Sequence, residues 1–210
     1  VVTGDHGDQH ENKYFIDYEI GPAYSGAYFD HWATLYNDEV KVPLIIKDAK
    51  IIPGNAGESI PHFVSLLDLA PTLLTNAQLQ VPVWCSGVSL DERITGKSDF
   101  IPIEGFQARA LIKGGRFKYI KSYKLTSKRL ISATNYSNWK SQIFVPEELF
   151  DLALDPQESK NLINENLTLA EEMRHLFKKY HQMQTTYRLI VNSPARKNIS
   201  IHIKKGKGIE

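Results

Sequence analysis

Hydrophobic and polar residues are patterned in two ways along the chain, and the change falls near residue 98. Before it, short apolar runs stand between helix-like segments: Val1–Thr3 and Leu44–Ile46 predict buried strands of one sheet. Residues 31–40 and 65–74 predict helices, the second because its leucines recur at helical spacing. Residues 1–98 therefore predict part of an α/β sandwich, in which helices cover a sheet.

Beyond residue 98 the pattern becomes that of an antiparallel sheet. Residues 107–113 and 116–122 are alternating runs, and Gly114-Gly115 between them predicts a two-residue hairpin turn. Residues 148–152 predict a further strand of this sheet. Residues 99–210 are therefore expected to form a small C-terminal subdomain that combines an antiparallel sheet with a helix.

The helix of this subdomain is predicted over residues 168–183. Thr168 and Glu171 have the spacing of a capping box, in which both side chains accept backbone N–H groups at the helix start. An apolar stripe at helical spacing is expected to lie on the sheet, and it comprises Leu169, Met173, Leu176, Phe177, Tyr180 and Met183.

Composition narrows the classes of function. The 210 residues carry 25 Lys and Arg against 24 Asp and Glu, a net charge of +1, so nothing favours a nucleic-acid partner. No apolar run is long enough for a transmembrane segment, and the single cysteine, Cys85, excludes an internal disulfide framework. The chain starts inside a predicted strand without an initiating methionine, so we expect further sequence upstream.

The stretch Gly4-Asp5-His6-Gly7, directly after the first predicted strand, carries candidate chemistry. Open α/β sheets bind ligands at the carboxyl ends of their strands. A carboxylate beside an imidazole can bind a divalent cation there, provided that the two glycines bend the backbone so that both side chains reach one ion. The alternative is a turn in which Asp5 caps the backbone and His6 lies on the surface.

The sequence contains, in order, Asp5-His6-Gly7, His31 five residues before Tyr36, Val42–Ile46, Ser65–Thr72, Gly87–Leu90 and, later, Glu148–Leu162. This series resembles the second half of the sulfatase family, which belongs to the alkaline-phosphatase-like superfamily. The resemblance covers residues 1 to about 185. It implies a partial alkaline-phosphatase-like α/β sandwich, followed by the antiparallel-sheet-plus-helix subdomain.

The resemblance also implies roles for three residues. Asp5 and His6 fall where the family places two ligands of a divalent metal ion, most often calcium. Many sulfatases have Asn in place of His6, whereas phosphonate- and phosphate-cleaving relatives have His, which suits manganese or zinc better. His31 falls where the family holds a Lys or His against the sulfate group, so a catalytic role is expected; alternatively, it faces solvent at a helix start.

The family's nucleophile has no counterpart in these 210 residues. Sulfatases use a formylglycine made from Cys or Ser in a Cys/Ser-x-Pro-x-Arg motif near the N-terminus, and Cys85 lacks the Pro and the Arg at those spacings. The resemblance therefore implies the C-terminal portion of a metal-dependent sulfatase, acting on an anionic small-molecule or glycan sulfate ester, catalytically incomplete alone and with formylglycine expected upstream. The alternatives are a phosphonate or phosphodiester hydrolase of the same superfamily and a non-catalytic binding fragment. The family favours an extracytoplasmic location, which the residues themselves leave open.

Overall fold

The computed structural model describes residues 1–7, 35–47, 57, 59–96, 98–105, 108–123 and 146–192, the last nine by their backbone only. The chain forms two compact units, Val1–Arg174 and His175–Glu210. The first unit contains residues from both regions that the sequence pattern separates, and the predicted domain boundary at residue 98 stays a prediction.

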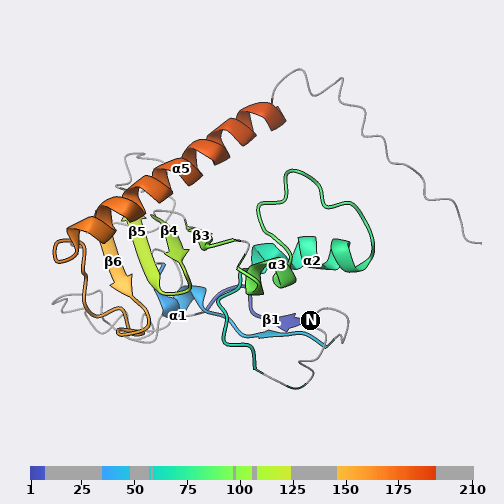
Figure 1. Cartoon of the computed structure of the whole chain (residues 1–210), viewed down its shortest axis with the longest axis horizontal. Helices are drawn as coiled ribbons and strands as arrows, with labels where there is room; N and C mark the ends of the chain where they lie inside the picture. Colours follow the sequence, from blue (N-terminus) through green and yellow to red (C-terminus); the bar gives the residue numbers. More distant parts are fainter. Residues whose placement is uncertain are drawn as a thin grey trace, which may run out of the picture. The chain divides into compact units, whose positions relative to one another are not determined.

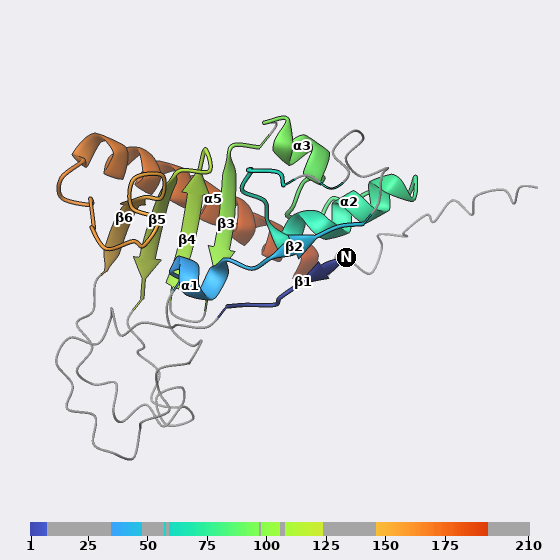
Figure 2. The same cartoon turned by 90° about the horizontal axis from the view of Figure 1, so that it is seen from below.

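Four antiparallel strands form the main sheet of the first unit, in the order β3-β4-β5-β6 (Figure 1, Figure 2). The predicted hairpin between β4 and β5 is confirmed, but the predicted two-residue loop is wrong: Lys113 pairs with Phe117, so the loop comprises residues 114–116. Gly114 and Gly115 in this loop have φ angles of 57° and 62°. A type I′ turn requires such left-handed values at both positions, and glycine adopts them without a steric penalty. β6 belongs to this sheet as predicted and pairs with β5, whereas β3, which pairs with β4, was not predicted. The strands are β3 (Phe100–Glu104), β4 (Ala108–Lys113), β5 (Phe117–Ser122) and β6 (Glu147–Asp151).

One face of this sheet packs against the segment that leads into α1 (Asn37–Val40). Leu35 and Tyr36 are buried in one hydrophobic cluster with Ile120 of β5 and Phe150 of β6. The rings of Tyr36 and Phe150 meet edge to face, with centroids 5.9 Å apart. Figure 2 shows α1 beside the ends of β3 and β4. The sheet therefore fixes where α1 lies.

The opposite face carries the first two turns of α5 (Leu167–Asn192), which confirms the predicted final helix and extends it (Figure 1). Ala170 and Met173 of these turns are fully buried. Arg174 donates from Nε to a carboxylate oxygen of Glu147 on β6, at 2.8 Å. Successive residues of a strand point to opposite faces. Glu147 faces α5, and the next residue, Glu148, faces Tyr36 beside α1. The sheet is therefore covered on both sides.

The N-terminus of α5 differs from the prediction. Oδ1 of Asn166 accepts the N–H of Leu169 at 3.2 Å, so Asn166 is the capping residue. The predicted capping box of Thr168 and Glu171 is therefore wrong, because the helix begins one residue earlier. Met183, the last residue of the predicted apolar stripe, is 55% exposed.

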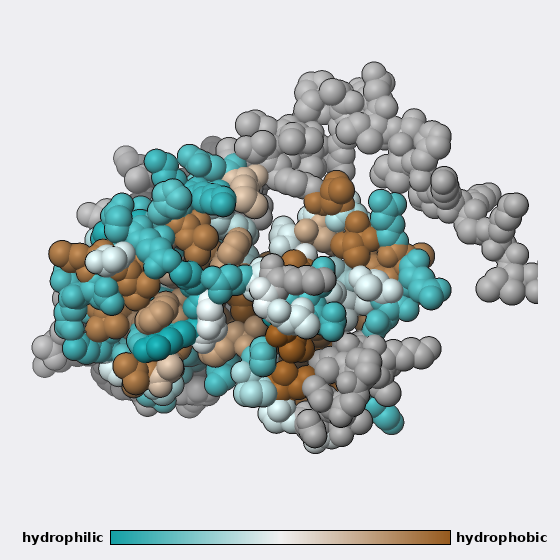
Figure 3. All heavy atoms as spheres, viewed as in Figure 1, coloured by the Kyte–Doolittle hydropathy of each residue, from teal (hydrophilic) through white to brown (hydrophobic). Residues whose placement is uncertain are grey.

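The N-terminal strands form a second, two-stranded antiparallel sheet. β1 (Val2–Thr3) pairs with β2 (Leu44–Ile45), which confirms that these two runs share a sheet. The expectation that they are buried is wrong, since Val2 and Ile45 are 64% and 62% exposed. Figure 3 shows further hydrophobic residues at the surface around α2 and the loop after it. These include Leu73, Leu79, Val83 and Trp84.

The helix predicted over residues 65–74 is confirmed as η2 (Leu66–Asp68) followed by α2 (Leu69–Asn76). Ser65 starts it with a capping box, in which its hydroxyl accepts the N–H of Leu67 and its own N–H donates to Asp68. A further helix, α3 (Leu90–Ile94), was not predicted.

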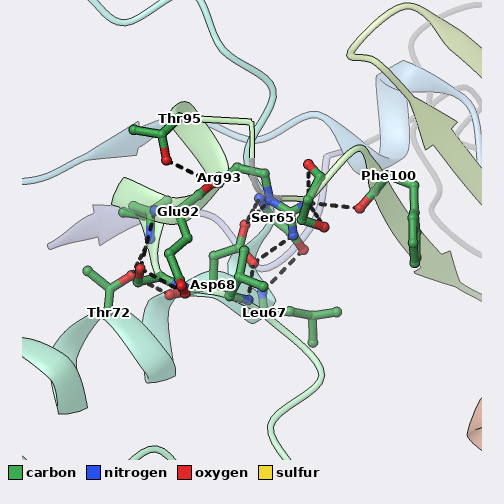
Figure 4. A network of polar contacts seen from close by, with 12 residues as sticks. Ser65, Leu67, Asp68, Thr72, Glu92, Arg93, Thr95 and Phe100 are labelled. Carbon is green, nitrogen blue, oxygen red and sulfur yellow. Dashed lines mark hydrogen bonds and ion pairs between the residues drawn. The ribbon is translucent and has the colours of Figure 1, made fainter.

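A buried ion pair joins these helices to the main sheet (Figure 4). Arg93 of α3 donates from Nε and Nη2 to the two carboxylate oxygens of Asp68, both at 2.9 Å. Asp68 also accepts the N–H of Val88 at 3.0 Å. Nη1 of Arg93 donates to the hydroxyl of Ser98 at 2.9 Å and to the carbonyl of Phe100, the first residue of β3, at 2.8 Å. Both charged side chains are almost completely buried.

We expect Asp68→Asn to destabilise the chain by about 3–5 kcal/mol, because the buried Arg93 guanidinium would lose its charged partner. Chemical denaturation would measure the free energy of unfolding. Asp91→Asn, on the exposed side of α3, is the matched control and should cost no more than about 1 kcal/mol. Equal losses in the two variants would contradict a dominant role for the ion pair.

Candidate metal centre

Asp5 and His6 follow β1 directly, and their side chains approach each other: Oδ2 of Asp5 lies 3.7 Å from Nε2 of His6. Consecutive side chains of a regular strand point to opposite faces, so the strand geometry has ended before this pair. Two ligand atoms that each stand about 2.0–2.6 Å from one ion can be separated by such a distance. The geometry therefore allows Asp5 and His6 to share a cation.

A backbone contact sets the tautomer of His6. Nδ1 lies 2.8 Å from the carbonyl oxygen of Gly7. A carbonyl only accepts hydrogen bonds, so Nδ1 carries the hydrogen, and Nε2 of the neutral ring presents a lone pair on the side of the Asp5 carboxylate. Two electron-pair donors that face each other favour a cation between them or a proton on Nε2. The donor set thus fits a divalent metal ion.

The pair also shows a feature of the alternative turn. Oδ1 of Asp5 accepts the backbone N–H of His6 at 3.1 Å, as in a self-capped turn. The Asp5 side chain is 91% exposed and that of His6 is 40% exposed. One oxygen of Asp5 therefore holds the turn, while the other faces the imidazole.

Gly7 is required for space. Its N–H donates to the carbonyl of Glu39 in α1 at 2.7 Å, and a Cβ at Gly7 would lie 2.0 Å from the carbonyl oxygen of Asp38. Neither Gly4 nor Gly7 has the positive φ that favours glycine over other residues. The turn is placed by its close approach to α1.

A buried polar cluster in turn fixes α1 on the main sheet. The N–H of Asn37 donates to Oε2 of Glu158 at 2.5 Å, and its Oδ1 accepts from Nζ of Lys118 at 3.2 Å. Lys118 and Glu158 form an ion pair with 2.7 Å between Nζ and Oε1. Beside them, the hydroxyl of Tyr36 donates to Oε1 of Glu148 at 2.6 Å.

Burial dominates the electrostatics of this cluster. Burial lowers the pKa of the Lys118 ammonium, and the adjacent Glu158 carboxylate only partly opposes this effect. Burial likewise raises the pKa of Glu148, against the hydrogen bond from Tyr36. This cluster was not predicted from the sequence. The alternation of β5 was the available signal, because it places Lys118 on the same face as Ile120.

His31, the predicted catalytic residue, lies outside the described residues. Within residues 1–7, 35–47 and the other described ranges, no group of three or more His, Cys, Asp or Glu side chains could hold a metal ion. Asp5 and His6 are therefore a pair of candidate ligands in that part of the chain. No helix in the same ranges is long and apolar enough to cross a membrane.

Comparison with known proteins gives consistent matches. The family described as N-sulphoglucosamine sulphohydrolase, C-terminal, matches residues 26–186. Arylsulfatase K of Xenopus laevis is 26% identical over 176 residues, which are 82% of this chain and 29% of that protein. A structure solved in complex with its substrate D-glucosamine-2-N,6-O-disulfate has a TM-score of 0.55 at 21% identity, covering 80% of this chain and 32% of that one. The chain thus spans less than a third of either relative.

Replacing Gly7 with Ala should displace the Asp5–His6 turn, because the new Cβ would collide with the carbonyl of Asp38. We expect shifted NMR signals of the His6 ring and a stability loss of about 1–3 kcal/mol. Gly4→Ala is the control, since its Cβ would meet its nearest neighbour, the His6 carbonyl, only at 3.4 Å. If the two variants behave alike, the contact with α1 does not place the turn.

Proposed function

The chain belongs to the sulfatase family and shares its alkaline-phosphatase-like fold, and from this premise we propose that it is the C-terminal portion of a metal-dependent sulfatase that hydrolyses sulfate esters. The observation that carries the proposal is the Asp5–His6 pair, whose facing oxygen and nitrogen stand 3.7 Å apart. The family match over residues 26–186 supports it.

In this proposal Asp5 and His6 hold a divalent cation through Oδ2 and Nε2. Calcium is the expected metal, with manganese or zinc as alternatives because His6 supplies an imidazole nitrogen. When bound, such a cation polarises the transferred group and stabilises the negative charge that develops on it. The Gly7 carbonyl supports this role, since its contact with Nδ1 keeps the lone pair of His6 on Nε2.

His31 is proposed to meet the sulfate group and to stabilise the leaving oxygen, by charge or by proton donation. The nucleophile is proposed to be a formylglycine from the part of the relatives that this chain does not match, because the 210 residues contain no Cys/Ser-x-Pro-x-Arg motif. The remaining metal ligands are proposed to come from the same part.

The proposed substrate is a sulfated glycan or another anionic sulfate ester. The structural relative solved with D-glucosamine-2-N,6-O-disulfate supports this class, as does the family description. An extracytoplasmic location is proposed with it. His6 favours one alternative, a phosphonate or phosphodiester hydrolase, because imidazole suits manganese and zinc.

A non-catalytic binding fragment is the second alternative, and the exposed apolar residues argue against it. Val2 and Ile45 expose more than half of their surface, and so does Trp84 after α2. Exposed apolar groups of this kind mark surfaces that other polypeptide covers. They support a role as one part of a larger catalytic domain.

Asp5→Ala should weaken the binding of Mn²⁺, because it removes a proposed ligand atom. Removing a residue that only hydrogen-bonds to a metal ligand lowers metal affinity roughly 10–100-fold, and the loss of affinity in Asp5→Ala should be larger. Paramagnetic broadening of the His6 ring signals in the 210-residue chain would measure it. His31→Ala should leave the metal affinity unchanged and, in the complete protein, lower kcat. Unchanged broadening in Asp5→Ala would refute the metal assignment.

The 210-residue chain alone should show no sulfatase turnover, because it lacks a residue that forms the covalent intermediate. An aryl sulfate assayed with calcium or manganese would test this. The control variant Cys85→Ala removes the single thiol. Turnover that persists in Cys85→Ala after strict metal removal would mean that the proposed mechanism is wrong.

A further inference from the structure

Glu158 has an unusual backbone conformation for its residue type. Its φ is 53°, in the left-handed region that favours glycine, and the residue is buried in the loop between β6 and α5. Gln78 has a similar φ of 56°, but it is exposed and follows the end of α2, where such a conformation is common. A strained conformation in a buried residue persists when the surroundings require its side chain.

The side chain of Glu158 contacts the first residue of α1 in two ways. Its Oε2 accepts the N–H of Asn37 directly. Its Oε1 pairs with Nζ of Lys118, and the same Nζ donates to Oδ1 of Asn37. Both members of the buried ion pair therefore hold Asn37. An anion at the start of a helix is also favoured by the N–H groups that have no partner within the helix.

α1 connects Asn37, which the ion pair holds, to the turn that carries the candidate ligands Asp5 and His6. It is four residues long, so its start at Asn37 and the carbonyls of Asp38 and Glu39 move together. These carbonyls contact Gly7, one through the hydrogen bond to Glu39 and one through the close approach of Asp38. Figure 2 shows the segment after β1 running to α1. Gly7, through its own carbonyl, also orients the His6 ring.

We propose that the buried Lys118–Glu158 pair positions the Asp5–His6 turn, acting through α1. Lys118 and Glu158 are thus positioning residues that do not touch the metal or the substrate. The positioning of the turn by the ion pair follows from contacts among the described residues. Its importance for function rests on the proposed metal site. The alternative is that the pair contributes only to global stability.

The decisive variant is Glu158→Gly, because glycine suits the left-handed backbone while the carboxylate is removed. Hydrogen exchange of the full 210-residue chain would compare the Asn37 and Gly7 amides with the amides of the β4–β5 ladder. We expect Gly7 protection to fall at least about tenfold more than that of the ladder, equivalent to about 1.4 kcal/mol. Mn²⁺ broadening of the His6 signals should weaken in parallel.

Two controls separate local coupling from lost stability. Gln78→Gly makes the same backbone change on an exposed helix end and should leave Gly7 protection unchanged. Asp68→Asn breaks the buried pair with Arg93 and should reduce Gly7 and ladder protection in the same proportion. Glu158→Gln keeps an oxygen that can accept the Asn37 N–H, so it should restore part of the Gly7 protection.

If Glu158→Gly does not fold, the double variant Lys118→Met with Glu158→Gln removes both charges together and leaves no unpaired buried charge. It should lower Gly7 protection in the same direction, because the Lys118 bond to Asn37 is lost. A uniform loss across Gly7 and the ladder would overturn the positioning role. Absence of Mn²⁺ broadening in the unmodified chain would refute the proposed metal site, and the exchange data would still decide the coupling.

Discussion

The buried Arg93 guanidinium links helices of the first sequence region to the sheet of the second, because it contacts both Asp68 and the carbonyl of Phe100. A buried guanidinium is tolerated only when its charge and donors are matched, because the cost of removing it from water is several kcal/mol. Asp68 supplies the negative charge, and Ser98 and Phe100 accept hydrogen bonds from Nη1 of Arg93. Phe100 is the first residue of β3. The hydrogen bonds of the Arg93 side chain therefore hold the helices α2 and α3 beside the main sheet.

A second buried pair, Lys118 with Glu158, meets the same electrostatic requirement on the face of the sheet that carries α1. The two faces of the sheet are used differently. Arg174 and Glu147 attach the start of α5 to one face by a partly exposed ion pair. The other face carries the hydrophobic cluster that contains Leu35, Ile120 and Phe150, and it also carries the buried Lys118.

Through these contacts a sheet late in the sequence is linked to the Asp5–His6 turn near its start. Lys118 of the sheet donates to Asn37 of α1, and Glu148 accepts from Tyr36 directly before α1. The carbonyl of Glu39 in α1 accepts the N–H of Gly7. Asp5 and His6 then lie at the surface, with a carboxylate oxygen and an imidazole nitrogen facing each other.

The sequence by itself determined the elements whose causes are local. Gly114-Gly115 specified the hairpin, because two successive left-handed residues need glycine, and helical periodicity specified α2 and most of α5. The order of short motifs identified the family. The cap of α5 was misassigned because Asn166 and Thr168 are both good capping residues, and sequence alone does not choose between them.

Only the tertiary structure decided which distant residues meet. Asn37 contacts Lys118 and Glu158 across 81 and 121 positions of sequence, and no periodicity encodes such pairings. The hydrogen bond and close approach between Gly7 and α1 are likewise contacts that the sequence pattern does not predict. Local sequence patterns predict which helix or strand each segment forms. How these segments pack together depends on tertiary contacts, because charged groups that become buried need partners.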